Sequence, residues 1–215
     1  IARSVVLSIA TKPEQFEPIL RWSKTFAGER LVPFLSLHPD DPVALDRIDE
    51  VHREGFLGIK LHPYYQKFVL DEDRMLPLYA RMEELGLILL SHTGFDVAFP
   101  RERRADPVRI RHVLDLFPRL KLVTSHLGGW EDWDEVRKYV LGRPVYVEIS
   151  YSLDFMDAQQ ARTLLLEHPA DFLLFGTDSP WADQGRALEQ LRSLKLDDER
   201  MEKMLSLNAE KLLAG

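Results

Sequence analysis

Seven short apolar runs, each followed by a helix-like segment, constrain the fold of this chain more than any other feature. The runs predict strands at 4–10, 31–37, 55–61, 87–92, 120–126, 144–150 and 172–175. Between most of them, apolar residues recur at the three- and four-residue spacing of an amphipathic helix. Strands that alternate with helices form parallel sheets with right-handed crossovers. The sequence therefore predicts an α/β fold built on parallel strands.

Two parallel architectures accommodate this pattern, a closed (β/α)8 barrel of the TIM type and an open doubly wound sheet. A barrel needs eight strands, and the chain begins at Ile1, directly before a predicted strand. We therefore expect that the first barrel strand is missing from the sequence. An open sheet needs no such strand, but its nucleotide-binding form requires a glycine-rich loop after the first strand, and none follows Ala10. We predict one barrel domain over residues 1–215.

The composition is that of an ordinary globular protein, with 45% hydrophobic and 29% charged residues. The formal charge of −7 argues against nucleic acid or an anionic membrane as the main partner. No apolar run approaches the roughly 18 residues that a membrane span needs. The absence of cysteine excludes disulfides and thiolate metal sites, and it fits a reducing cytoplasm. We expect a cytoplasmic protein that binds a small-molecule substrate.

Three predicted strands end in residues that can carry chemistry, namely His92, His126 and Asp178. In a parallel α/β fold the carboxyl ends of the strands meet at the face that carries the active site. Imidazole and carboxylate groups are ligands for Zn²⁺ and similar divalent ions. The alternative is a local role for each, with a histidine bonded to a loop carbonyl or Asp178 sharing a helix cap. The following Ser179 and Pro180 predict the N-cap and first residue of that helix.

Four further residues are candidates for substrate binding: Lys60, His62, Trp181 and Arg101. Each has a simpler interpretation. Lys60 could pair with a nearby carboxylate, His62 could be a hydrogen-bonded loop residue, and Trp181 could pack under a loop. Arg101 belongs to a charged run that could be solvated, although guanidinium groups also bind carboxylates in a bidentate manner.

The remaining polar residues receive less weight. Three histidines, His52, His112 and His168, fall within predicted helices or at their ends, and we expect them on the surface. Glu148 alternates with apolar neighbours on the seventh barrel strand, but the face to which it points is undetermined, so we leave it outside the site.

Five motifs follow one another in order: Gly58-Ile-Lys-Leu-His-Pro63, Ser91-His-Thr-Gly94, Ser125-His-Leu-Gly-Gly129, Phe175-Gly-Thr-Asp-Ser-Pro180 and Asn208-Ala-Glu-Lys-Leu212. Together they resemble the amidohydrolase superfamily, specifically its amidohydrolase-related branch. That branch contains hydrolases and also decarboxylases of aromatic or unsaturated carboxylic acids. The resemblance covers the whole chain and is strongest in the last three motifs.

The resemblance implies a (β/α)8 barrel with a divalent metal, usually zinc or manganese, at the carboxyl ends of the strands. It implies that His92 and Asp178 are metal ligands and that Asp178 also handles the proton of the attacking water. His126 would orient or polarise the substrate, or bind a second metal. Lys60 would bridge two metals as a carbamate or contact the substrate. Barrels of this branch often form homodimers.

One feature of the resembled family is missing. Its members carry His-x-His, two metal ligands, on the first strand, and this sequence contains no His-x-His. A catalytic zinc needs about three protein ligands, of which His92 and Asp178 supply two. Either the first strand is missing from the sequence, which we expect, or the protein does not hold metal in the family's way.

These observations predict a metal-dependent hydrolase of an amide, ester or lactone. In it, Asp178 transfers protons and His126 stabilises the developing oxyanion. The alternatives are a non-oxidative decarboxylase that uses the same residues and a metal-free barrel that binds a ligand without turnover.

Overall fold

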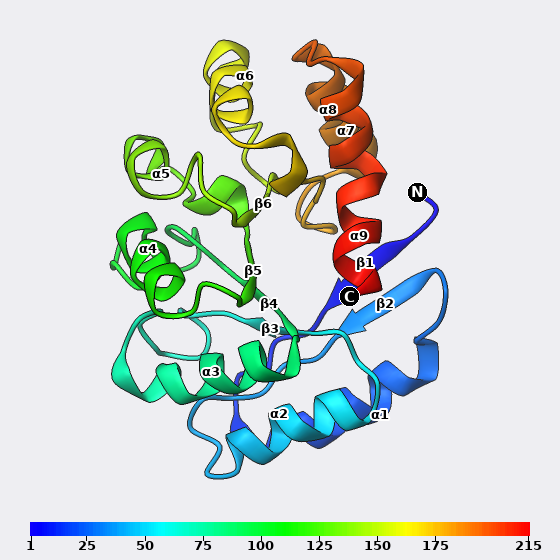
Figure 1. Ribbon diagram of the computed structural model, residues 1–215, viewed down its shortest axis with the longest axis vertical. Helices are drawn as coiled ribbons and strands as arrows, with labels where there is room; N and C mark the ends of the chain where they lie inside the picture. Colours follow the sequence, from blue (N-terminus) through cyan, green and yellow to red (C-terminus); the bar gives the residue numbers. More distant parts are fainter. The chain divides into compact units, whose positions relative to one another are not determined.

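The computed structural model describes residues 1–215, in which strands and helices alternate along the chain (Figure 1). The strands are β1 (Ser4–Leu7), β2 (Leu31–Phe34), β3 (Gly58–Leu61), β4 (Ile88–Ser91), β5 (Lys121–Thr124), β6 (Tyr146–Glu148) and β7 (Leu173–Leu174). The longer helices are α1 (Phe16–Phe26), α2 (Ala44–Arg53), α3 (Leu76–Leu85), α4 (Pro107–Leu116), α6 (Ala158–Glu167) and α7 (Gln184–Ser193). Each of the seven predicted strands is confirmed, and each is shorter than its apolar run.

The chain divides into two compact units, one of residues 1–92 with 112–122 and one of residues 93–111 with 123–215. In the first unit β1 pairs with β2 and β3 pairs with β4, and a bridge between Leu35 and Ile59 connects β2 to β3. In the second unit β5 pairs with β6, and β6 pairs with β7. All of these pairings are parallel, as the alternation of strands and helices predicts.

The core of the first unit is formed by its strands and by α1, α2 and α3, which lie along the same side of these strands in Figure 1. α1 buries Phe16 and Leu20, four residues apart, while α2 buries Ile48 and Val51, so each helix presents one apolar face. β3 and β4 are buried at all four positions. Such continuous burial is typical of parallel strands that are covered on both faces.

The second unit contains the shorter helices α5 (Trp133–Tyr139), α8 (Asp198–Glu202) and α9 (Asn208–Ala214), with a π-helical turn over Lys203–Leu207. Aspartates cap three of its helices: Asp157, Asp183 and Asp197 each accept a hydrogen bond of 2.8 Å from the backbone N–H three residues ahead. These contacts satisfy amide groups that have no partner within the helix. No helix of the chain is long and apolar enough to cross a membrane.

Two local predictions are wrong. Residues 179–180 lie in a turn, and α7 begins only at Gln184, because Asp183 and not Ser179 accepts the capping hydrogen bond. His168, predicted on the surface, is 1% exposed, and its Nε2 donates to the Val145 carbonyl over 2.9 Å. It is the residue directly after α6 and has an extended backbone, and burial lowers the pKa of His168 to about 4.

Candidate metal and catalytic site

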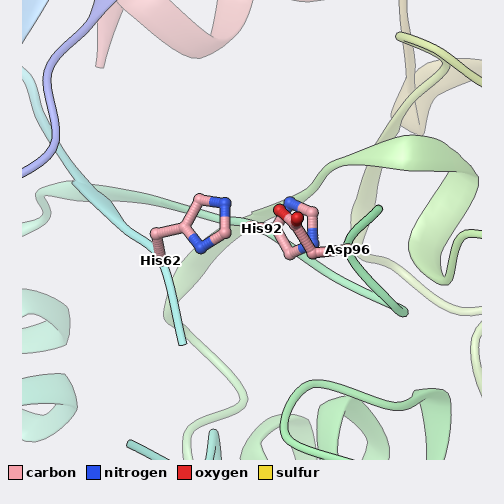
Figure 2. Close-up of side chains that lie close together, drawn as sticks. All are labelled: His62, His92 and Asp96. Atoms are coloured by element: carbon pink, nitrogen blue, oxygen red, sulfur yellow. The ribbon is translucent and has the colours of Figure 1, made fainter. Parts of the chain in front are cut away.

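Two histidines stand side by side at the ends of two paired strands of the first unit. Leu61, the last residue of β3, is the register partner of Ser91, the last residue of β4, and the N–H of His92 donates to the Leu61 carbonyl. The next residue of each strand, His62 after β3 and His92 after β4, therefore lies beside the other at the same end of the strand pair. Their rings stack with centroids 4.1 Å apart and planes inclined by 17° (Figure 2), and both side chains are buried.

The stacked rings are donors suited to a divalent metal. One ring nitrogen of His62, one ring nitrogen of His92 and one carboxylate oxygen of Asp96 all lie within 4.8 Å of one another. Asp96 is four residues after His92 in the chain. Figure 2 draws the three side chains together. Two imidazoles and a carboxylate form a ligand set that zinc and manganese accept. The sequence predicts His92 as a metal ligand and His62 as a substrate contact, and no pattern in it indicates Asp96.

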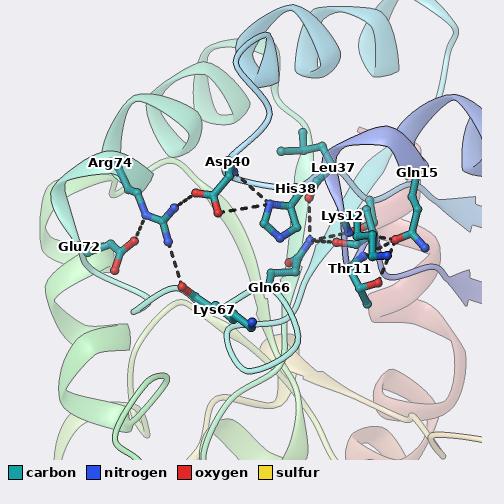
Figure 3. A network of polar contacts seen from close by, with 12 residues as sticks. Thr11, Lys12, Gln15, Leu37, His38, Asp40, Gln66, Lys67, Glu72 and Arg74 are labelled. Atoms are coloured by element: carbon teal, nitrogen blue, oxygen red, sulfur yellow. Dashed lines mark hydrogen bonds and ion pairs between the residues drawn. The ribbon is translucent and has the colours of Figure 1, made fainter.

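A buried glutamine supports this strand end. The Oε1 atom of Gln66 accepts the N–H of His62 over 2.7 Å. Its Nε2 donates to the Leu37 carbonyl over 2.7 Å (Figure 3). The same Nε2 donates to the Ala10 carbonyl over 2.9 Å. The side chain of Gln66 is fully buried. One amide group therefore connects the segments that follow β1, β2 and β3, a role that no pattern in the sequence indicated.

His38 belongs to the same polar network but has a local role. Its Nδ1 accepts the N–H of Asp40 over 3.1 Å, and Asp40 contacts the guanidinium of Arg74 (Figure 3). Burial lowers the pKa of His38, against the opposing effect of Asp40. The hydrogen bond between His38 and Asp40 stabilises the turn after β2.

His126, the second of the three predicted strand-end residues, lies in the second unit. It follows β5, is 6% exposed and has a φ of 53° in the left-handed region. Its N–H donates to Glu148 Oε1 over 3.1 Å, and its Nδ1 lies 3.0 Å from the Ser150 carbonyl oxygen. The ring is thus fixed from the neighbouring strand β6, which ends at Glu148.

Glu148 is the residue that the sequence left unassigned, and the structure shows its direction. It is buried, and its two oxygens accept hydrogen bonds from His126 and Ser150. The only signal in the sequence is the alternation within β6, which does not say to which side Glu148 points. The pairing of β5 with β6 shows that Glu148 points toward His126.

Asp178 and Trp181 follow β7 and are both exposed, Trp181 to 77%. Asp178 has a φ of 57°, and its carbonyl accepts the N–H of Trp181 over 2.8 Å, which forms a tight turn. Arg101, also exposed, pairs with Glu131 over 3.0 Å, and its guanidinium lies 4.1 Å from the centroid of the Phe95 ring. Lys60 is a buried residue of β3 in the first unit.

Gly94 explains part of the Ser-His-Thr-Gly motif. Its φ is 83°, and a Cβ placed on it would lie 2.0 Å from the backbone nitrogen of Trp130. Only glycine permits this close approach of two backbones. The glycine two residues after His92 is therefore required by the path of the loop.

The amidohydrolase family model matches residues 7–214. The chain belongs to the amidohydrolase family. The family resemblance drawn from the five motifs is thereby confirmed, and the match covers strands β2 to β7 in full. Members of this family depend on divalent metals, which agrees with the His62, His92 and Asp96 donors.

Among curated relatives, a dihydroorotase from Pseudomonas fluorescens (strain SBW25) is 34% identical over 111 residues. The similarity covers 47% of this chain and 32% of that protein. The matched region thus spans about a third of the length of the curated relative.

Solved structures confirm the predicted TIM-type barrel. An uncharacterised TIM-barrel protein from Bordetella bronchiseptica superposes with a TM-score of 0.77 at 25% identity, covering 99% of this chain and 78% of that one. A 5-carboxyvanillate decarboxylase from Novosphingobium aromaticivorans, with bound manganese, gives a TM-score of 0.79 at 15% identity, covering 100% and 78%. At that identity the second likeness concerns the fold alone.

Proposed function

We propose that this amidohydrolase is a metal-dependent hydrolase of a small amide, ester or lactone. The observation that carries the proposal is the pair of imidazoles at the ends of β3 and β4, with a carboxylate oxygen of Asp96 within 4.8 Å of a nitrogen of each ring. Hydrolysis is favoured because the relatives with shared sequence are dihydroorotases, 34% identical in the case above. The decarboxylases resemble the chain in fold, at 15% identity.

The metal in this proposal is zinc, with manganese as the second choice. His92 and Asp178 are the proposed ligands from the sequence, and His62 and Asp96 offer further donors. A bound divalent ion would supply Lewis acidity toward a carbonyl oxygen and would lower the pKa of a bound water toward 7.

The chain's own residues carry the proton transfers and the binding of substrate. Asp178 takes a proton from the attacking water and delivers it to the leaving group. His126 contacts the reacting part of the substrate from the end of β5. Lys60, His62, Trp181 and Arg101 are the proposed contacts to the rest of the substrate, with Trp181 offering an aromatic surface and Arg101 a cation.

Metal content and turnover test this proposal together. Elemental analysis of the purified protein should give about one equivalent of zinc or manganese per chain, as a mononuclear site requires. His92→Ala and Asp178→Asn should lose the metal, whereas His52→Ala, an exposed position on α2, should retain it.

A panel of amides, esters and lactones should then be screened beside aromatic carboxylic acids. We expect hydrolysis that is abolished in His92→Ala, which loses the metal, and that is unchanged in His52→Ala. Release of CO₂ from an aromatic acid without any hydrolysis would replace the proposal by the decarboxylase. Protein that takes up neither Zn²⁺ nor Mn²⁺ would support a barrel that binds without turnover.

A further inference from the structure

The contacts of the His126 ring favour one tautomer. Its Nδ1 lies 3.0 Å from the carbonyl oxygen of Ser150, and a carbonyl oxygen can only accept a hydrogen bond. The Ser150 hydroxyl also lies 3.3 Å from Nδ1, but it donates to Glu148 Oε1 over the shorter 2.6 Å. The contacts therefore favour a proton on Nδ1. In the neutral ring the lone pair is then on Nε2, the nitrogen at the far end of the imidazole.

One carboxylate holds both parts of this arrangement. Glu148 Oε1 accepts the N–H of His126 over 3.1 Å and the hydroxyl of Ser150 over 2.6 Å. Glu148 Oε2 accepts the N–H of Ser150 over 2.8 Å. Glu148 thus holds the backbone of His126 directly. It also holds Ser150, whose carbonyl accepts the hydrogen bond from the His126 ring.

The backbone of His126 needs such support. Its φ of 53° lies in the left-handed region, which a residue with a Cβ enters at a cost in energy. The hydrogen bond from its N–H to a buried carboxylate opposes that cost, because bonds to charged groups are stronger than neutral ones.

Gly176 provides the room for the carboxylate. A Cβ built on Gly176 would lie 2.0 Å from Glu148 Oε2 and 3.1 Å from its carboxyl carbon. The glycine two residues before Asp178 therefore leaves the space into which Glu148 extends. Strand β6 and the segment after β7 together define the position of this side chain.

We propose that Glu148 is a positioning residue that holds His126 in the Nδ1–H tautomer, so that His126 acts through the lone pair of Nε2. The neutral ring then accepts a proton or a hydrogen bond at that atom. This differs from donation to an oxyanion, the role that the sequence suggested for His126. The placement of His126 beside the substrate rests on the proposed function, whereas the tautomer and its dependence on Glu148 do not.

The tautomer can be measured directly in the full chain. Protein labelled with ¹⁵N-histidine and supplied with diamagnetic Zn²⁺ gives long-range ¹H–¹⁵N correlations that distinguish a protonated ring nitrogen from an unprotonated one. The signals of His126 are identified by their loss in His126→Asn. We expect protonated Nδ1 and unprotonated Nε2 at pH 8. A wild-type ring protonated at Nε2 would overturn the proposal at once.

Two variants then test the role of Glu148. In Glu148→Gln the side chain keeps its size, but one carboxylate oxygen becomes an NH₂ group, which cannot accept a hydrogen bond. Depending on the orientation of the amide, the backbone N–H of either His126 or Ser150 then loses its acceptor. In Gly176→Ala no polar group changes, and the added methyl displaces the carboxylate. Both variants should show a second His126 population protonated at Nε2. The exposed Glu189→Gln should match the wild type.

With a substrate in hand, both variants should lower kcat by roughly tenfold or more, with little change in KM, since supporting residues of this kind act on the reacting group. If no substrate is hydrolysed, the proposed function fails and the tautomer result still stands. If Glu148→Gln and Gly176→Ala both keep a single Nδ1–H tautomer, the positioning role fails whatever the activity.

Discussion

His168 and His126 carry the same side chain, and their surroundings give them different properties. His126 follows a strand and contacts the polar groups of Glu148 and Ser150. His168 is buried directly after α6 and donates one hydrogen bond, to the Val145 carbonyl. Removing an imidazole from water disfavours its charged form, and the pKa of His168 falls to about 4 for this reason.

The stability of the protein should therefore depend on His168 at mildly acid pH. The unfolded chain binds a proton at His168 near pH 6.5, and the folded chain does so only near pH 4. The contribution of the neutral residue is fully present above pH 6.5 and is lost as the pH falls from 6.5 to 4. Between pH 7.5 and pH 5 we expect a loss of about 2 kcal/mol in the free energy of unfolding.

Urea unfolding of the wild type and of His168→Gln at these two pH values measures the effect. Glutamine can still donate to the Val145 carbonyl but does not titrate, so the variant should lose less stability on acidification. His38, whose pKa burial also lowers, titrates in both proteins and cancels in the difference. Equal losses in the two proteins would contradict the assignment.

At the scale of elements, the strand ends of the first unit are held by Gln66 as well as by packing. Its amide satisfies the N–H of His62 and the carbonyls of Ala10 and Leu37, and all three groups lie at the ends of strands or just beyond them. Strand pairing alone does not fix residues beyond the last ladder bond, so a side chain supplies the missing contacts.

Gln66→Leu should therefore destabilise the protein by roughly 3 kcal/mol, because a buried group that loses its partner costs about 1–3 kcal/mol and some of these groups can rearrange. Gln159→Leu, on the exposed side of α6, should change the free energy of unfolding by less than about 0.5 kcal/mol. Denaturant unfolding compares the two. A Gln66→Leu variant as stable as Gln159→Leu would show that packing alone holds these strand ends.

At the scale of the whole molecule, metal binding should add to stability, because an ion that binds the folded chain and not the unfolded one shifts the equilibrium. A free concentration of 100 times the Kd should add about 2.7 kcal/mol. Calorimetric unfolding with and without Zn²⁺ measures this, and His92→Ala should abolish the increase. His52→Ala should preserve it, and an equal increase in both variants would place the ion elsewhere.

The strands and most helices could be predicted because their signals are local. An apolar run or a helical spacing is contained within a dozen neighbouring residues, and the paired strands are parallel as that alternation requires. The prediction for Ser179 and Pro180 was wrong because two residues that suit a helix start do not establish one. The capping contact of Asp183 sets the start of α7.

The candidate site likewise has parts that local sequence signals predict and parts that depend on residues far apart in the chain. The sequence by itself determined that His92, His126 and Asp178 follow strands, since position in a strand is a local property. Only the tertiary structure decided that His62 stacks on His92, that Gln66 connects three strand ends, and that Glu148 faces His126. Each of these depends on the register between strands far apart in the chain, and register arises from packing that no single segment encodes.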